Sequence, residues 1–450
     1  MKFALTQVPI TPDYPVFLAG YGGRSAKREG VVDDIYAKAA LLQATEGDTL
    51  LLLTIDALGG DRSFMAGIRA ALKDAFGLKP EQVLVNFSHT HYSVYMTGEQ
   101  PTGRRGGYSL GQDRWPEQDS DVDYTEDIRF FRVVREKIVQ LVRSCYDRLE
   151  EGSLRIGQGV TQVGINRRLR TPEGTSMRPN PDGPVDRDLF VLQLTDRSGS
   201  LRGILFSCAS HPTSLAANRI SAEFVGAACT ELQARYPGSL ALFLQGCAGD
   251  IKPTATMDAD GAKFKTLPVE AMREAGAKLA DEVAAVLDAK RPMAEAGPRW
   301  QAARADVRLF TEPWGAAELE ALIADEGLTE YRRRAARRTL KALQEGRVKA
   351  FVPQEIQVWS FGPAAAVVAL EGEVPAEYAL QVKALFGSTP VIALGYSNGV
   401  STYIPTRQIL KDGGYEAEAF ILHGIRGPLV PENEALIVGT VALLKNELGI

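Results

Sequence analysis

Residues 82 to 93 read Gln-Val-Leu-Val-Asn-Phe-Ser-His-Thr-His-Tyr-Ser, and our interpretation of the whole chain starts from them. The apolar residues from Val83 to Phe87 predict a short buried strand that runs directly into His89 and His91. In an extended backbone, residues two apart point to the same side, so we expect both imidazoles to project together from the strand end. Such a pair suits a metal ligand beside a proton carrier, although two ordinary loop histidines would give the same pattern.

The small number of histidines favours the metal interpretation. The chain has four of them: His89, His91, His211 and His423. His211 also follows a buried strand, which we predict over residues 203–208. Three of the four histidines therefore stand at strand ends, which is typical of residues collected into one site.

Composition excludes several classes of protein. The net charge of -5 leaves no basic stripe with which to bind nucleic acid. No apolar run approaches the ~20 residues that cross a bilayer, and the first residues predict a strand rather than a signal peptide. The cysteines are widely spaced in apolar surroundings, so we expect reduced, buried thiols: Cys145, Cys208, Cys229 and Cys247. We expect a cytoplasmic globular protein without stable membrane association.

The pattern of strands and helices predicts an α/β fold with mixed β-sheets and flanking helices. Hairpins are expected over residues 35–56, 189–208 and 355–370. Amphipathic helices are expected over residues 64–76, 124–149, 222–236, 268–289, 316–344, 376–385 and 431–448. The second and third hairpins share an outline in which two strands lead to a metal-ligating type of residue. Because no linker separates these units, we predict a single domain over 1–450, with the metal site at converging strand ends.

A long segment rich in Gly, Pro, Asp and Arg runs from Tyr95 to Asp123. A loop of this length is usually functional or disordered. Because it leaves directly from His91, a lid over the site is one interpretation, and disorder is the other.

A carboxylate completes the expected site. The third hairpin ends at Glu371-Gly372-Glu373, and either acid together with His89 and His211 would form the two-histidine, one-acid set of catalytic zinc sites. The two glutamates have the same strand parity, so periodicity does not choose between them. A solvent-facing acid at a strand end remains the alternative for each.

Several short motifs, in this order, resemble those of the neutral, non-lysosomal ceramidases, which are zinc-dependent amide hydrolases. The resemblance spans nearly the whole chain and rests on Ser88-His89-Thr90-His91, Ala209-Ser210-His211-Pro212-Thr213, Phe243-Leu244-Gln245-Gly246-Cys247-Ala248-Gly249-Asp250-Ile251, Gly372-Glu373, Tyr403-Ile404-Pro405-Thr406 and Gly413-Gly414-Tyr415-Glu416. It implies the fold of the ceramidase catalytic domain.

The resemblance also implies roles for individual residues. His89, His211, Glu373 and Tyr403 would hold Zn²⁺, and the glycine before the acid favours Glu373 over Glu371. His91 would be the general acid and base. Arg167 and Tyr415 would orient the substrate carbonyl and its oxyanion. From the residues alone, amphipathic packing is the alternative for the two tyrosines, and a surface ion pair is the alternative for Arg167.

The chain also departs from the ceramidase pattern. Lys252-Pro253 stands where the family usually has Ser-Pro, so the suggested serine nucleophile is absent and a metal-activated water is the simpler mechanism. We expect the chain to lack the family's C-terminal β-sandwich domain. It has no basic amphipathic helix with which to approach a membrane.

We therefore predict a zinc-dependent hydrolase that cleaves an amide, ester or lactone bond of a small soluble molecule. The alternatives are a metal-dependent lyase or isomerase acting next to a carbonyl, a true ceramidase acting on N-acyl-sphingosine, and a non-catalytic binding protein. The sequence gives neither the acyl group nor the oligomeric state.

Overall fold

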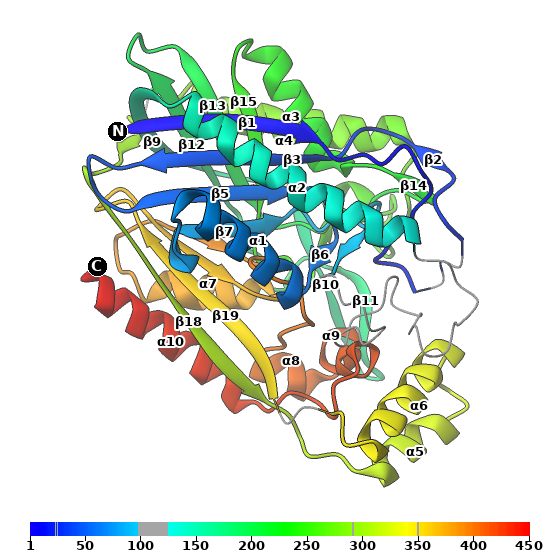
Figure 1. The fold of residues 1–450 in the computed structure, drawn as a ribbon. Coiled ribbons are helices and arrows are strands. Elements are labelled where there is room, and N and C mark those ends of the chain that lie inside the picture. Colours follow the sequence, from blue (N-terminus) through cyan, green and yellow to red (C-terminus); the bar gives the residue numbers. More distant parts are fainter. Residues whose placement is uncertain (23, 25, 98–124, 290–291, 349–350) are drawn as a thin grey trace.

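One arrangement of strands occurs three times in the computed structural model, which describes residues 1–22, 24, 26–97, 125–289, 292–348 and 351–450. In each repeat, three antiparallel strands are followed by a helix and by a fourth strand that is parallel to the third. The first repeat consists of β1 (Lys2–Pro9), β3 (Tyr36–Gln43), β5 (Thr49–Ile55), α1 (Arg62–Phe76) and β7 (Val83–Phe87). Figure 1 shows it in blue, with β1 above β3 and β5 and with α1 and β7 near the middle of the view.

The second and third repeats follow the same order. The second consists of β9 (Glu150–Val160), β12 (Asp188–Asp196), β13 (Leu201–Cys208), α3 (Glu223–Arg235) and β15 (Leu240–Gln245). The third consists of β18 (Arg299–Phe310), β19 (Phe351–Ser360), β20 (Ala366–Leu370), α7 (Ala376–Ala384) and β21 (Val391–Leu394). The predicted mixed α/β fold and the three predicted hairpins are therefore confirmed.

A long helix follows each repeat and packs against its first strand (Figure 1). These helices are α2 (Thr125–Asp147) on β1, α4 (Val269–Leu287) on β9 and α10 (Glu432–Leu448) on β18. Buried residues of α2 fall at helical spacing, among them Phe130, Val134, Ile138 and Leu141, so one face of the helix is apolar and covers the sheet.

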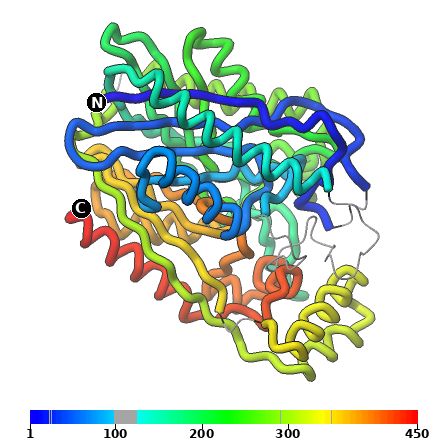
Figure 2. Tube along the Cα trace, in the orientation of Figure 1, coloured from blue at the N-terminus to red at the C-terminus, as the bar shows by residue number. Residues whose placement is uncertain are grey.

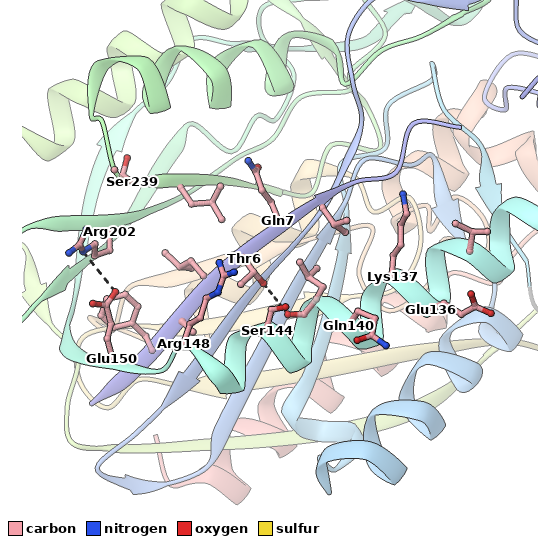
Figure 3. A pocket seen from close by; sticks show the side chains of 18 residues that line it. Thr6, Gln7, Glu136, Lys137, Gln140, Ser144, Arg148, Glu150, Arg202 and Ser239 are labelled. Atoms are coloured by element: carbon pink, nitrogen blue, oxygen red, sulfur yellow. Dashed lines mark hydrogen bonds and ion pairs between the residues drawn. The ribbon is translucent and has the colours of Figure 1, made fainter. Parts of the chain in front are cut away.

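The first two repeats share one sheet, in the order β15-β13-β12-β9-β1-β3-β5-β7. Among the described residues, strand pairing between the two repeats is confined to Lys2 with Glu151 and Phe3 with Glu150. Beyond these pairs the two halves of the sheet separate, and an open cavity of about 1120 Å³ lies between β1, α2 and the start of β15 (Figure 3). The third repeat forms its own sheet, in the order β21-β20-β19-β18-β4.

The last strands of the three repeats meet at their carboxyl ends, and the buried Asn86 joins them. Its side-chain amide donates to the carbonyl oxygens of Gln245, at 3.2 Å, and Gly395, at 2.9 Å. Its Oδ1 accepts a hydrogen bond from the Gln245 amide at 2.7 Å. The main chains also meet, since the Phe87 amide donates to the carbonyl of Tyr396 at 3.0 Å. The segments that carry the candidate site residues leave from this junction.

Short elements complete the chain. They are β2 (Gly30–Val31), β4 (Glu46–Gly47), β6 (Gly59–Gly60), η1 (Pro80–Gln82), β8 (Tyr95–Met96), β10 (Gly164–Thr171), β11 (Gly174–Asn180), β14 (Arg219–Ile220), β16 (Ile251–Pro253), η2 (Thr254–Thr256), β17 (Ala294–Glu295), α5 (Ala316–Ala324), α6 (Glu330–Gln344), α8 (Arg407–Asp412), α9 (Tyr415–Glu418) and η3 (Ala419–His423). The four cysteines are buried and unpaired, as predicted.

The prediction of one helix over residues 316–344 is wrong. The segment folds as α5 and α6, and both helices stand apart from the sheets in the arm at the lower right of Figure 2. Residues 325–329 separate them, and the Asp325 side chain accepts a hydrogen bond from the Gly327 amide, which turns the chain. The organisation as a single domain over 1–450 stays a prediction.

Candidate metal centre

Three of the four histidines come together where the repeats meet. The metal-binding atoms of His89, His91 and His211 all lie within 4.8 Å of one another, and all three side chains are buried. The two Nε2 atoms of His89 and His91 are 3.3 Å apart. The expectation that histidines at separate strand ends converge on one place is met.

The route by which His89 and His91 converge differs from the prediction. Strand β7 ends at Phe87, and His89 has a left-handed backbone with φ of 60°. A non-glycine residue rarely adopts this conformation because its Cβ crowds the backbone, so the expectation of an extended chain through His91 is wrong. The left-handed turn, and not strand alternation, brings the two rings together.

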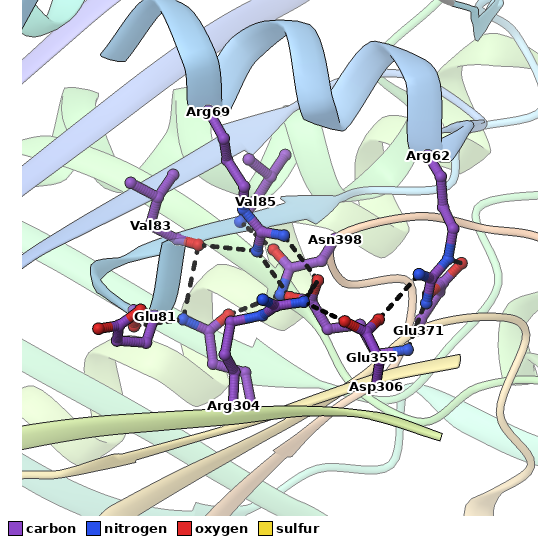
Figure 4. Close-up of polar contacts among 11 residues, drawn as sticks. Arg62, Arg69, Glu81, Val83, Val85, Arg304, Asp306, Glu355, Glu371 and Asn398 are labelled. Atoms are coloured by element: carbon purple, nitrogen blue, oxygen red, sulfur yellow. Dashed lines mark hydrogen bonds and ion pairs between the residues drawn. The ribbon is translucent and has the colours of Figure 1, made fainter. Parts of the chain in front are cut away.

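A carboxylate faces two of these histidines. Oε2 of Glu373 lies 3.2 Å from Nε2 of His89 and 3.2 Å from Nε2 of His211. Glu371, the other acid of equal parity, points elsewhere: its carboxylate pairs with Arg62 of α1 and accepts a hydrogen bond from the Glu355 amide (Figure 4). Gly372 between them has φ of 102°, a conformation that lets the two side chains diverge. The structure therefore places Glu373, and not Glu371, at the histidines.

The second nitrogens of the histidine rings fix the tautomers. Nδ1 of His89 lies 2.5 Å from the carbonyl oxygen of Leu58, and Nδ1 of His211 lies 2.6 Å from that of Ala248. A carbonyl only accepts, so each Nδ1 carries the proton and each Nε2 presents a lone pair. One carboxylate oxygen of Glu373 thus lies 3.2 Å from each of two imidazole lone pairs.

Three lone-pair atoms this close repel one another unless a cation or a proton lies between them. The two imidazole nitrogens and the carboxylate oxygen therefore fit the ligand set of a divalent metal ion. The charge states agree with this interpretation. Burial first, and then the nearby Arg167, lower the pKa of His211 to about 4. Burial would raise the pKa of Glu373, but His89 and His211 hold it well below its usual range. Neutral imidazoles and an ionised carboxylate are the forms that bind metal.

His91 lies at the edge of this cluster. Its Nδ1 has no hydrogen-bond partner among the described residues, unlike those of His89 and His211. Its ring packs edge-on against Tyr21, with 4.9 Å between the ring centroids. Arg24 donates a hydrogen bond to the His91 carbonyl, which fixes the backbone at this point. The ring is thus held by packing and is not oriented by a carbonyl.

Arg167, Tyr403 and Tyr415 are also brought together. The Arg167 guanidinium donates to the Tyr403 hydroxyl at 3.0 Å and to Glu416 at 2.8 Å. The rings of Tyr403 and Tyr415 meet edge-on with 5.4 Å between their centroids. Residues Glu373 and Tyr403 are neighbours across a short β-bridge, so the tyrosine stands beside the carboxylate segment. Arg167 is therefore buried and paired, and the alternative of a surface ion pair is wrong.

Tyr396 is a site residue that sequence reasoning missed. Its ring centroid lies 4.3 Å from that of His89, and its hydroxyl oxygen is 3.5 Å from each ring nitrogen of His211. It has φ of 50°, close to that of His89. A signal for it exists: Tyr396 follows β21 at the same spacing at which His89 follows β7.

The remaining histidine and the predicted loop lie differently. His423 is half-buried at the end of η3, with its ring centroid 6.5 Å from that of Tyr403. Of the loop predicted over residues 95–123, Tyr95 and Met96 form β8, and residues 98–123 lie outside the described part of the chain. No helix of the described part is long and apolar enough to cross a membrane.

Comparisons with known proteins identify the fold of this chain. No protein-family model matches the sequence, and no curated protein matches it. Two solved structures are similar over 99% of this chain. One is a neutral ceramidase from Pseudomonas aeruginosa, with TM-score 0.72, 20% identity and 74% of its own chain covered. The other is a ceramidase complexed with C2, with TM-score 0.71, 18% identity and 75% covered. The predicted neutral-ceramidase-like fold is therefore confirmed.

Proposed function

We propose that this chain, which has the fold of the neutral ceramidases, is a zinc-dependent hydrolase that cleaves an amide, ester or lactone bond of a small soluble molecule. The observation that carries the proposal is the set of bare acceptors formed by His89, His211 and Glu373 at 3.2 Å, with His91 beside them. The ceramidase names of the two similar structures support an amide as the first of the three bonds to test.

His89, His211, Glu373 and Tyr403 would hold the ion. When bound, zinc supplies a Lewis acid that activates water and polarises a carbonyl oxygen. A histidine-and-carboxylate set is typical of catalytic zinc, whereas structural zinc is usually closed by four protein ligands and has no proton carrier beside it. His91 argues for catalysis for this reason.

His91 would carry the proton. Its Nε2 lies 3.3 Å from that of His89, so it reaches the place where a nucleophilic water would stand. In the neutral ring one nitrogen accepts and the other donates, and no group of the described residues binds Nδ1 of His91. The ring can therefore take a proton from water and pass it to the leaving group.

Arg167 and Tyr415 would stabilise the negative charge that develops on the carbonyl oxygen. Burial alone would lower the pKa of Arg167, but Tyr403 and Glu416 raise it well above its ordinary value, so the guanidinium stays charged. Burial raises the pKa of Tyr415 to about 12, so its hydroxyl stays protonated and can donate. Fixed donors aimed at a developing oxyanion are usually a large part of catalysis.

Two enzymatic alternatives use the same residues. A lyase or isomerase would use the cluster to acidify a carbon next to a carbonyl, and a true ceramidase would cleave N-acyl-sphingosine. A hydrolase takes up one water per bond cleaved, so incorporation of ¹⁸O from labelled water into the released acid distinguishes it from a lyase or isomerase. A non-catalytic binding protein would show no turnover on any substrate.

The test combines metal content with turnover. The purified chain should hold about one zinc per molecule by elemental analysis. His89→Ala and His211→Ala should lose it, and His423→Ala, which lies beyond Tyr403, should keep it. A panel of short amides, esters and lactones then assays hydrolysis. Equal metal content in all three variants would contradict the proposed centre whatever the panel shows.

A further inference from the structure

Two adjoining cavities lie next to the metal centre, with volumes of about 510 and 550 Å³. They share Lys252 and Phe264 as lining residues. Arg24 and Lys265 also line the first, and Arg178 and Lys263 line the second. We refer to the two cavities together as the basic pocket. Volumes of this order suit a small molecule or part of one.

The basic pocket borders the candidate site on two sides. Tyr21 lines it, and the ring of Tyr21 packs on His91 at 4.9 Å. Lys252 follows Ile251, whose carbonyl accepts a hydrogen bond from the His211 amide at 3.2 Å. The basic pocket therefore adjoins the histidines through Tyr21 and through the residue before Lys252.

The charged side chains among the described residues that line the basic pocket are all cationic. No aspartate or glutamate is among the described residues that line either cavity. The Arg24 guanidinium donates hydrogen bonds to the carbonyls of Ala19, His91 and Ala217. Arg178 donates to the carbonyl of Ala262. This excess of cations contrasts with the net charge of -5 of the whole chain.

Lys252 is the residue that both cavities share. Its Nζ lies 5.4 Å from the centroid of the Phe264 ring, and the described residues offer it no ion pair. Glu223 acts on it through space, but that carboxylate is already bound by Ser214 and by the amides of Leu215 and Phe224. Burial first, and then the positive charge of Arg167, lower the pKa of Lys252 to about 8. Such a partly desolvated cation gains from binding an anion.

We propose that the basic pocket holds an anionic group of the substrate, a carboxylate or a phosphate, with Lys252 as its counter-ion. The word substrate rests on the function proposed above, whereas anion binding itself does not. Lys252 stands where the ceramidase pattern has a serine, so this chain has a positive charge in place of a hydroxyl. The substrates of this chain would then differ from neutral lipid amides in charge as well as in size.

Direct binding provides the first test. Calorimetric titration of the full chain uses succinate and inorganic phosphate as anions and succinamide as the neutral control. Lys252→Met should weaken binding of the preferred anion by about 10- to 100-fold, the usual worth of a hydrogen bond to a charged group, and Lys252→Arg should retain it. Lys2→Met, at an exposed position, should bind like the wild type. The tighter of the two anions identifies the group.

Hydrolysis provides the second test, with N-acetylglycine and its neutral analogue N-acetylglycinamide. The wild type should prefer the anionic member in kcat/KM, and Lys252→Met should lose that preference by the factor seen in binding. Anion binding through Lys252 without cleavage of any bond would refute the proposed function and leave the basic pocket standing. Cleavage with no preference, together with unchanged anion binding in Lys252→Met, would overturn the basic pocket and leave the hydrolase standing.

Discussion

Gly20 lies against His91 so closely that a Cβ atom on Gly20 would stand 2.5 Å from Nδ1 of the imidazole. Gly20 also has φ of 96°, a conformation that other residues rarely adopt. Together with Tyr21 and Arg24, it fixes the ring and the backbone of His91. The position of the candidate proton carrier thus depends on a glycine about 70 residues earlier in the chain.

Gly20→Ala should therefore reduce turnover while the metal stays bound. The new methyl group displaces the His91 ring, and misplacing a catalytic group by about 1 Å costs about 100-fold. Gly199→Ala is the matched control, because Gly199 has φ of 83° but nothing within 4 Å of the added Cβ. Both variants carry the backbone strain, and only Gly20→Ala disturbs His91. Equal activity in the two would contradict the assignment of His91.

His91→Ala should keep the metal and lower kcat by about 10²–10⁴-fold, the usual contribution of a general acid or base. The measurement pairs elemental analysis with steady-state kinetics. Because His91 lies within the cluster of three histidines, loss of zinc in this variant would make it a ligand and would remove it from proton transfer.

Glu373→Gln and Glu371→Gln form a matched pair two residues apart. The first should lose zinc, because an amide oxygen binds zinc more weakly than a carboxylate. The second should keep zinc but unfold at a lower temperature, because Arg62 of α1 loses its buried carboxylate partner and keeps only the exposed Asp306. Zinc loss confined to Glu371→Gln would reverse the assignment.

Catalytic efficiency should not rise steadily along an amide series from acetyl to palmitoyl. Each buried methylene contributes up to about 0.8 kcal/mol, so an enzyme with a long apolar trough would gain at every step. The described surroundings of the histidines are instead polar and cationic, with Arg167, Arg24 and Lys252. A steady rise with chain length would favour the ceramidase alternative.

The KM for an anionic substrate should increase as the pH rises through about 8. The pKa of Lys252 is lowered to about 8 by burial and by Arg167, so the ammonium is charged below this pH and neutral above it. Glu223 opposes the shift, and Lys263 and Lys265 also line the basic pocket. Lys252→Arg should abolish the dependence, because arginine stays protonated. The neutral analogue, assayed in parallel, should show no such increase.

The sequence predicts the strand ends of this fold better than the paths between them. Buried strands are marked by apolar runs, so the places of His89 and His211 follow from local pattern. The left-handed turn at His89 does not follow, because its backbone is held by tertiary contacts, including the hydrogen bond from its amide to the carbonyl of Ala57. Sequence periodicity contains no such contact.

The choice between Glu371 and Glu373 shows the same limit. Strand parity makes them equivalent, and only the positive φ of Gly372 separates them. The repetition was partly predictable from the sequence, since the second and third hairpins share an outline. The first hairpin was not recognised as another copy of this unit. The segment after β5 carries Leu58, which contributes a backbone carbonyl oxygen to the site and not a side chain. A backbone hydrogen-bond acceptor for His89 cannot be identified from residue types.

The convergence of three repeats on one junction has a consequence for how the protein loses structure. His211 and Glu373 are 162 residues apart, and His89 belongs to yet another repeat. In the unfolded chain, the closure entropy of such long loops keeps these groups from meeting, so the complete donor set exists only in the native state. A metal that binds there adds RT ln(1 + [M]/Kd) to the free energy of unfolding. Removal of the metal by a chelator should consequently lower the unfolding temperature of all three repeats together. The concentration of free zinc would then determine the stability of the folded protein.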